Sequence, residues 1–293
     1  MLLYECPEVF DKLDFAGVTK VIFELINNKS KIHAYCESIG LNMPKTYNYD
    51  DIIDNKEIEF PLIFKLNTKK INPDNNPIGK VRIVNNDIEL QHLLSEISTS
   101  SISNEDIIIQ AYIAGDNSHQ FSFGGYFKDG VELAGIVVNQ LRQYPQGISS
   151  FVVETSNKDI EKTIIKSVMS FVESLKYTGF LEMEFKIGNN QIFLMDINPR
   201  PWGWVSILEE KYKNFYKLFS GDDNIKLIKS NQIVMWKSPI RDIIGKIKNP
   251  LNSKKKIKVS KRYLAYDIYD KSDLMPSLAI FKVGIDKLVK KFR

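Results

Sequence analysis

The stretch TGFLEMEFKIGNNQIFLMDINPRPWGW, residues 178–204, decides how the rest of the chain is interpreted. It contains two apolar runs rich in residues that favour strands, FLEMEFKI and QIFLMDIN, separated by Gly188-Asn189-Asn190. Gly-Asn-Asn is typical of a turn between strands, so the stretch predicts a β-hairpin.

Polar side chains of the predicted hairpin gather at defined positions. In the first run Glu182 and Glu184 alternate with apolar residues, so both carboxylates lie on one face of the strand. The second run is apolar on both faces, as in a covered strand, until Asp196 and Asn198 appear at its end. A carboxylate at that place keeps its charge only beside a cation, a metal ion or several donors.

The length of the turn decides whether these side chains meet. A three-residue loop pairs Ile187 with Gln191, brings Glu184 and Asp196 to one face and places Glu182 opposite Asp196. A two-residue loop would put the acids of the two strands on opposite faces. We expect the three-residue loop, because Gly-Asn-Asn can supply a left-handed residue.

Carboxylates and an amide oxygen, followed by Arg200, suit a hard cation bridged to phosphate and a guanidinium for a further anion. The pattern Glu184-Phe185, then Asp196-Ile197-Asn198-Pro199-Arg200, resembles the metal-binding end of ATP-grasp ligases. The resemblance implies that Glu184, Asp196 and Asn198 hold one or two Mg²⁺ ions with ATP, and that Arg200 faces the reacting carboxylate or phosphate. The alternative is a polar-faced hairpin without such a role.

Two departures and one refinement accompany this resemblance. Asp196 stands where many members of the family have Glu, and its shorter side chain still supplies two oxygens. Pro201-Trp202-Gly203 resembles a subgroup of carboxylate-amine ligases that includes D-aspartate ligases. The resemblance makes residues 68–84 a loop that covers phosphate, with a return strand from Lys80 to Val84. This loop is poorer in glycine than family loops, so Lys69, Lys70 or Lys80 is expected to replace backbone donors.

Two lysines in the first third of the chain match phosphate-binding positions of the family. Residues 27–47 predict a turn, a helix over residues 30–39 and an extended segment at Pro44, with Lys29 just ahead of the helix. Residues 59–67 predict a strand that carries Lys65. Alone, each lysine is typical of a solvated side chain. A further strand is expected at residues 21–25.

The middle of the chain predicts a hinge and a continuing meander. A helix is expected over residues 86–98, and strands over 107–113 and 120–127. The resemblance assigns adenine to the backbone of the hinge and makes Asp116 the candidate for ribose; the hinge residues are Gln110, Ala111, Tyr112 and Ile113. A plain hairpin is the alternative.

Arg142 follows a strand-rich run and precedes a Tyr-Pro-Gln-Gly turn. Related ligases have an arginine in this region, so the resemblance makes Arg142 a second candidate for stabilising an acyl phosphate. An ordinary surface arginine is the alternative. A helix with a core-facing apolar stripe is expected over residues 157–176.

Composition bounds the class of protein. With 293 residues, 43% of them hydrophobic, the chain is long enough for two lobes with cores of their own. The net charge of +4 does not demand a nucleic-acid partner. Cys6 and Cys36 predict neither a disulfide framework nor a zinc site, and no run reaches the length of a membrane span. These features favour a soluble, cytoplasmic protein.

The end of the chain is basic. Residues 245–262 contain eight Lys or Arg and no acid, and residues 277–293 predict an amphipathic helix. A solvated basic face is one interpretation, and contact with anionic lipid or an acidic partner is the other.

Together, these resemblances imply an α+β ATP-grasp fold, with two lobes whose antiparallel sheets enclose a nucleotide cleft. The expected divisions are a short segment 1–25, a first lobe 26–112, a second lobe 113–230 and a basic segment 231–293. The expected activity is ATP- and Mg²⁺-dependent joining of a small carboxylate to an amine. Alternatives are a kinase, a carboxylase-like enzyme, a silent nucleotide-binding module docked by its basic tail, or a lipid-docking scaffold without nucleotide. Few residues precede Lys29, so a partner chain is one candidate source of the family's usual N-terminal domain.

Overall fold

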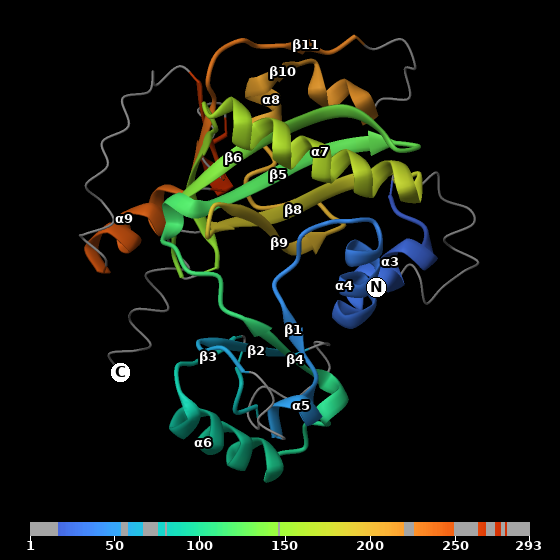
Figure 1. Cartoon of the computed structure of the whole chain (residues 1–293). Coiled ribbons are helices and arrows are strands. Elements are labelled where there is room, and N and C mark those ends of the chain that lie inside the picture. The colour runs from blue at the N-terminus through green and yellow to red at the C-terminus, as the bar shows by residue number, and fades with distance from the viewer. Residues whose placement is uncertain are drawn as a thin grey trace.

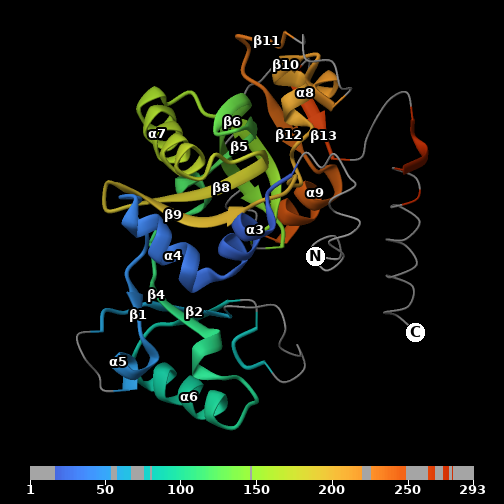
Figure 2. The same cartoon turned by 90° about the vertical axis from the view of Figure 1, so that its right-hand side faces the viewer.

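The computed structural model describes residues 17–53, 58–66, 76–79, 81–145, 147–219, 226–248, 263–267, 273–276 and 279. The protein has a four-stranded sheet and a seven-stranded sheet, each accompanied by helices, and a separate two-stranded pair (Figure 1). The small sheet lies beneath the large one in both views, joined to it by the segments that follow α4 and β4 (Figures 1 and 2). The predicted α+β fold with two lobes is confirmed.

The small sheet has the strand order β1-β4-β2-β3, and all its pairs are antiparallel. Helix α6 covers it, because Leu90, Leu93 and Ile97 recur at helical spacing and pack with Phe64 and Ile109 of the strands. The elements of this lobe are β1 (Thr46–Tyr47), α5 (Tyr49–Ile53), β2 (Leu62–Leu66), β3 (Arg82–Val84), α6 (Asp87–Ser98), η2 (Asn104–Asp106) and β4 (Ile107–Ala111).

The large sheet has the order β13-β12-β7-β6-β5-β8-β9. Its pairs are antiparallel except β12 with β13, which is parallel. Its strands are β5 (Gln120–Lys128), β6 (Val131–Gln143), β7 (Ser149–Glu154), β8 (Gly179–Gly188), β9 (Gln191–Asn198), β12 (Met235–Lys237) and β13 (Leu264–Tyr266).

One face of the large sheet is covered by α7 (Lys158–Leu175), α3 (Lys20–Asn27) and α4 (Lys29–Ser38) (Figure 2). Asn157 caps α7 by accepting from the backbone N–H groups of Asp159 and Ile160, each at 3.1 Å. The buried side chains on this side form one core, which includes Ile32 of α4 and Leu194 of β9. Residues 26–41, which the sequence assigned to the first lobe, thus contribute to the core of the large sheet.

Residues 21–25 are helical, and the predicted strand there is wrong. Helix α3 (Lys20–Asn27) begins after Thr19, whose hydroxyl accepts from the N–H of Ile22 at 3.4 Å. Val18, Ile22 and Ile26 are four residues apart and all buried, which is the spacing of one helix face. Tertiary burial at this spacing outweighs the strand preference of the β-branched residues.

The other face of the large sheet carries an aromatic core that includes Trp202, Trp204 and Trp236. Residues of α8 (Ile207–Lys211), β10 (Tyr212–Lys213) and η4 (Phe215–Phe219) belong to this core. The remaining elements are η3 (Asn117–His119), β11 (Ile228–Lys229) and α9 (Pro239–Lys248), and α9 contacts Arg142 of β6 and Lys237 of β12. Because β12 and β13 complete the large sheet, part of the predicted basic segment belongs to this lobe.

Other expectations have mixed outcomes. The helices expected near 30–39, 86–98 and 157–176, and the strands expected near 59–67, 107–113 and 120–127, are present within a few residues. Lys69, Lys70, Lys80 and most of the expected C-terminal helix lie outside the described residues. Within the described part of the chain, no helix has the length and apolar character needed to cross a membrane.

Candidate functional site

The turn of the hairpin formed by β8 and β9 is shorter than predicted. Gly188 pairs with Gln191, which leaves only Asn189 and Asn190 in the loop. Both have positive φ, 48° and 59°, as a two-residue type I′ turn requires. The predicted three-residue loop is therefore wrong.

A β-bulge restores the predicted convergence of the acids. Phe185 pairs with Leu194, but Glu184 pairs with Asp196, so Met195 is an extra residue on β9. The bulge shifts the register by one residue, and directly opposed residues share a face. Glu184 thus lies opposite Asp196, and Glu182 lies opposite Asn198 rather than opposite Asp196 as expected.

Asn198 links the two glutamates of β8. Its Nδ2 donates to Glu182 Oε2 and to Glu184 Oε1, each at 3.3 Å. The indole Nε1 of Trp204 donates to Glu182 Oε1 at 3.0 Å. Because both carboxylate oxygens of Glu182 accept hydrogen bonds, Glu182 orients the amide of Asn198 and leaves the other side of that amide available.

Glu182 is buried in this arrangement, with 6% of its surface exposed. Burial, reinforced by the negative charge of Glu184, raises the pKa of Glu182 to about 8. Arg200 and the hydrogen bond from Trp204 act in the opposite direction. The carboxylates are therefore crowded, which favours a cation among them.

The two tryptophans of Pro201-Trp202-Gly203-Trp204 pack directly on the strand at Gly124. A Cβ placed on Gly124 would lie 2.2 Å from Trp202 Cζ2 and 2.8 Å from Trp204 Cη2. The indole rings have centroids 5.0 Å apart. Gly124 pairs with Glu182 across β5 and β8, so this close approach holds Trp204 at the distance that its hydrogen bond to Glu182 needs.

Two lysines from distant parts of the sequence reach the acids. Lys29 begins α4, and its Nζ contacts Asp196 Oδ1. Lys65 of β2 donates to Gln110 Oε1 at 3.1 Å. Burial lowers the pKa of Lys65, while Asp196 and Glu184 raise it and Lys29 lowers it further, so these charges are close enough to interact.

The predicted hinge connects the two lobes, and several of its polar groups already make hydrogen bonds within the protein. The amide of Gln110 accepts from Lys65 and donates to Thr46 Oγ1 at 3.3 Å. The N–H of Tyr112 donates to the carbonyl of Pro61 at 3.0 Å. Ile113 packs against the turn of the hairpin, since a Cβ on Gly188 would lie 2.5 Å from its Cγ2.

Asp116, the candidate for ribose, caps the short helix η3. Its Oδ1 accepts from the N–H of Ser118 at 2.8 Å and contacts His119 Nδ1 at 2.9 Å. Hydrogen bonds from Ser118 and then His119 lower the pKa of Asp116 to about 2. The side chain is thus an anion whose one oxygen is committed to the turn.

The two candidate arginines have different surroundings. Arg200 is exposed, donates to the carbonyl of Pro201 at 3.0 Å and interacts electrostatically with Glu182. Arg142 donates through Nε to Asp242 Oδ1, and its guanidinium carbon lies 4.3 Å from the centroid of the Phe151 ring. The structure brings Arg200 to the acids and gives Arg142 contacts with α9 and β7 instead.

Sequence reasoning left three residues out of the candidate site. Glu182 and Trp204 form the support of Asn198 described above. Lys186, on the same face of β8, is 8% exposed, and its Nζ lies 4.9 Å from the centroid of the Tyr112 ring. Burial lowers the pKa of Lys186, and Asp116 opposes this effect. The alternation of Glu182, Glu184 and Lys186 along one face was the available signal.

The donor set for a metal ion consists of two acids and an amide. Among the described residues, no three His, Cys, Asp or Glu side chains form a group that could hold a metal ion by themselves. Glu184, Asp196 and Asn198 supply only hard oxygen donors, which Mg²⁺ prefers and usually completes with water and phosphate oxygens.

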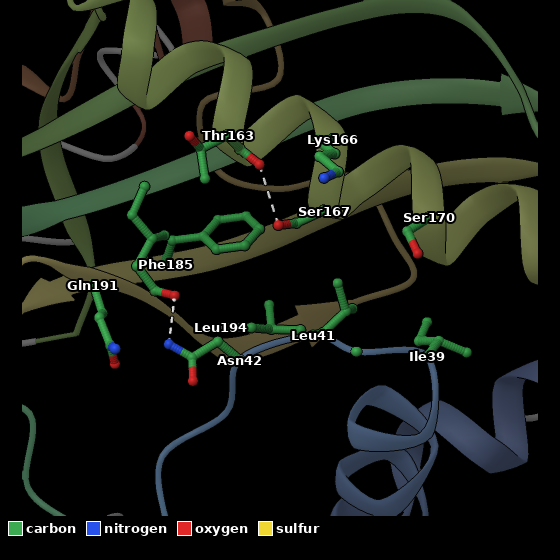
Figure 3. A pocket seen from close by; sticks show the side chains of 12 residues that line it. Ile39, Leu41, Asn42, Thr163, Lys166, Ser167, Ser170, Phe185, Gln191 and Leu194 are labelled. Carbon is green, nitrogen blue, oxygen red and sulfur yellow. Dashed lines mark hydrogen bonds between the residues drawn. The ribbon is translucent and has the colours of Figure 1, made fainter.

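The larger of the two described cavities lies on the opposite face of the hairpin. It has a volume of about 510 Å³ and lies between α7, β9 and the segment that follows α4 (Figure 3). Thr163, Lys166, Ser167 and Ser170 of α7 line its upper side in this view, and Asn42 closes it below. The second cavity, of about 310 Å³, is lined by Glu154, Lys211 and Lys229 among others. Neither contains the candidate site residues.

Comparison with known proteins identifies the fold. No model of a protein family matches the chain, and no curated protein matches its sequence. Among solved structures, the biotin carboxylase domain of a 2-oxoglutarate carboxylase from Hydrogenobacter thermophilus, determined with MgADP, ADP and bicarbonate, has a TM-score of 0.60 at 16% identity. That match covers 78% of this chain and 53% of the other.

Two further structures carry different activities on the same fold. N5-carboxyaminoimidazole synthetase from Staphylococcus aureus, complexed with ADP, has a TM-score of 0.59 at 16% identity over 80% of this chain and 61% of its own. L-amino acid ligase from Bacillus licheniformis has a TM-score of 0.54 at 16% identity over 78% of this chain and 57% of its own.

The chain thus spans about half to three fifths of the length of the solved structures that it resembles. Their common architecture is that of ATP-grasp ligases. With its two sheets, its hinge and the acidic hairpin facing two lysines, this chain has the ATP-grasp fold.

Proposed function

We propose that the protein is an ATP- and Mg²⁺-dependent ligase that joins a small carboxylate to an amine. The observation that carries this proposal is the meeting of Lys29 with Asp196, two side chains 167 residues apart in the sequence. Lys65 interacts electrostatically with the same carboxylate and with Glu184. A cluster of lysines facing acids and an amide is what a nucleoside triphosphate with its cation requires.

Glu184, Asp196 and Asn198 would hold Mg²⁺, and the residues present fit this ion. Their donors are all oxygens, and the contact between Lys29 and Asp196 supports accommodation of positive charge here. Support from Glu182 and Trp204 fixes the amide of Asn198, as ordered second partners do at many metal sites. When bound, Mg²⁺ would neutralise the phosphate oxygens of the nucleotide.

The roles of the protein's own groups follow from their charges. Lys29 and Lys65 would neutralise the phosphates, so that a substrate carboxylate can approach the γ-phosphorus. A carboxylate oxygen would bond to this phosphorus as the bond to ADP breaks, which gives an acyl phosphate. Arg200 would offset the charge on the acyl phosphate. An amine would then attack the acyl carbon, lose a proton and expel inorganic phosphate, leaving an amide.

The hinge would hold the adenine. The buried, apolar side chain of Ile113 and the buried Lys186 near Tyr112 support this assignment. Asp116 keeps its role as the candidate for ribose through the oxygen that does not cap η3. Arg142 stays a second candidate for the acyl phosphate only if it exchanges its contact with Asp242.

A carboxylase-like reaction is the second candidate, because solved structures of this fold include both a biotin carboxylase and an L-amino acid ligase. The substrates are proposed to be small molecules in the cytoplasm.

Phosphate release tests the function. Purified protein with ATP and Mg²⁺ is screened against amino acids and short peptides, singly and in pairs, and products are identified by mass spectrometry. A ligase releases phosphate in proportion to an amide product and needs both a carboxylate and an amine. Asp196→Asn should abolish this release, whereas Asp159→Asn, at an exposed position of α7, should not. Bicarbonate-dependent release without an amine would favour the carboxylase, and ATP binding without any release would exclude the ligase.

A further inference from the structure

Helix α9 is attached to the protein by its polar face. Asp242 is fully buried and contacts Arg142 through Oδ1 and the amines of Lys237 and Lys246 through Oδ2 at 3.0 and 2.9 Å. One turn later, a Cβ on Gly245 would lie 3.2 Å from Tyr144 Cβ. The side of α9 that faces the large sheet is therefore defined by an aspartate and a glycine.

The opposite side of α9 is apolar and exposed. Ile240, Ile243 and Ile247 are 43%, 56% and 74% exposed. At about 100° per residue, these three side chains form one stripe nearly opposite the side that contacts the sheet. A helix on the surface of a globular protein normally has the reverse orientation, with its apolar stripe towards the core.

Positive charge flanks this isoleucine stripe. Arg241 and Lys248 lie along one border and Lys246 along the other, and Arg241 and Lys248 are exposed. Asp242 contacts three cations, Arg142, Lys237 and Lys246, so the side of α9 that faces the sheet has an excess of positive charge. The printed sequence continues with six more Lys or Arg up to residue 262 and no acid.

We propose that α9 docks this protein on an anionic lipid surface. The isoleucine stripe would enter the boundary between headgroups and acyl chains, with the helix axis parallel to the membrane. The exposed Arg241 and Lys248 would lie at the level of the phosphates. Charge complementarity selects this occupant, because an apolar stripe bordered by cations matches the two layers of an anionic bilayer interface. The inference is independent of the proposed ligase activity.

Vesicle sedimentation of the full chain tests this proposal. Vesicles of phosphatidylcholine alone are compared with vesicles containing about one third phosphatidylserine, at low and high salt. We expect the protein to sediment with the anionic vesicles and to be released by salt. The double variant Ile243→Gln and Ile247→Gln should reduce the partition coefficient by about tenfold or more. Circular dichroism should be unchanged, because both positions are exposed.

Ile88→Gln is the matched control, since Ile88 is 83% exposed on α6. This variant should sediment like the unmodified protein. If all three proteins sediment equally, or if none sediments, α9 is not a membrane-docking helix. If the stripe variant instead abolishes self-association measured by ultracentrifugation while vesicles bind none of the proteins, the stripe is an interface between copies and the proposal is overturned.

Discussion

The buried carboxyl of Glu182 should make the free protein less stable as the pH rises. Its pKa is raised from an ordinary 4.5 to about 8. Between these pH values the carboxyl is ionised in the unfolded chain and protonated in the folded chain, so the free energy of unfolding decreases as the pH increases. A rise of this size corresponds to about 5 kcal/mol once the pH exceeds the folded value.

The substitution Glu182→Gln removes this titration and keeps the size of the side chain. Glu184 and Asp196 share the electrostatic repulsion with Glu182, so only part of the pKa rise belongs to Glu182 alone. Near pH 9 and without Mg²⁺, we therefore expect the free energy of unfolding of Glu182→Gln to exceed that of the unmodified protein by at least about 2 kcal/mol. Near pH 4 the gain should vanish, and loss of a hydrogen-bond acceptor for Asn198 or Trp204 should leave the variant slightly less stable.

Urea unfolding followed by tryptophan fluorescence, from about pH 4 to about pH 9 with chelator, measures this difference. Glu105→Gln, at an exposed position of η2, is the control and should show no such trend. A difference between Glu182→Gln and the unmodified protein that stays constant with pH would refute the reasoning, because the carboxyl would then not be protonated in the folded state.

Three further predictions concern the same site. Gly124→Ala should lower the free energy of unfolding by about 2 to 3 kcal/mol, because the added methyl group would clash with Trp202. The control Gly203→Ala should change the free energy of unfolding little, because the space around Gly203 is open. Thermal unfolding measures both variants. Trp204→Phe should raise the Mg²⁺ concentration needed for half-maximal phosphate release about tenfold, with a smaller change at saturating Mg²⁺. Lys65→Met should weaken ATP binding by about tenfold or more, as measured by calorimetry. It should not lower the temperature of thermal unfolding, because burial already disfavours the charged form of Lys65. Unchanged ATP affinity would exclude contact between Lys65 and phosphate.

The hairpin shows which part of the site was predictable. Alternation along β8 correctly placed its acids on one face, because strand geometry has a strict period of two. The turn was wrong, since both asparagines adopt left-handed conformations and make a shorter loop. The bulge at Met195 shifts the register by one residue and places Glu184 opposite Asp196, so the predicted meeting of the acids is still observed. Bulges depend on packing from neighbouring elements, so the local sequence carries little signal for them.

Contacts between distant segments were predictable only through family resemblance. No local pattern relates Lys29 to Asp196, and the pairing depended on recognising both motifs. The helix at residues 20–27 was missed because its β-branched residues favour a strand in isolation, while burial at a spacing of four residues decides the outcome. Arg142 was assigned from its neighbourhood in the sequence, which does not show its partner Asp242, one hundred residues later.

Calorimetric titration with ATP tests the central claim most directly, namely that the acids of the hairpin and the two lysines form one cation-dependent nucleotide site. We predict that the unmodified protein binds ATP in the presence of Mg²⁺, that chelator weakens binding strongly, and that Asp196→Asn weakens it by about a hundredfold while unfolding remains cooperative. Equal ATP affinity with and without Mg²⁺, or in the unmodified protein and Asp196→Asn, would contradict the account.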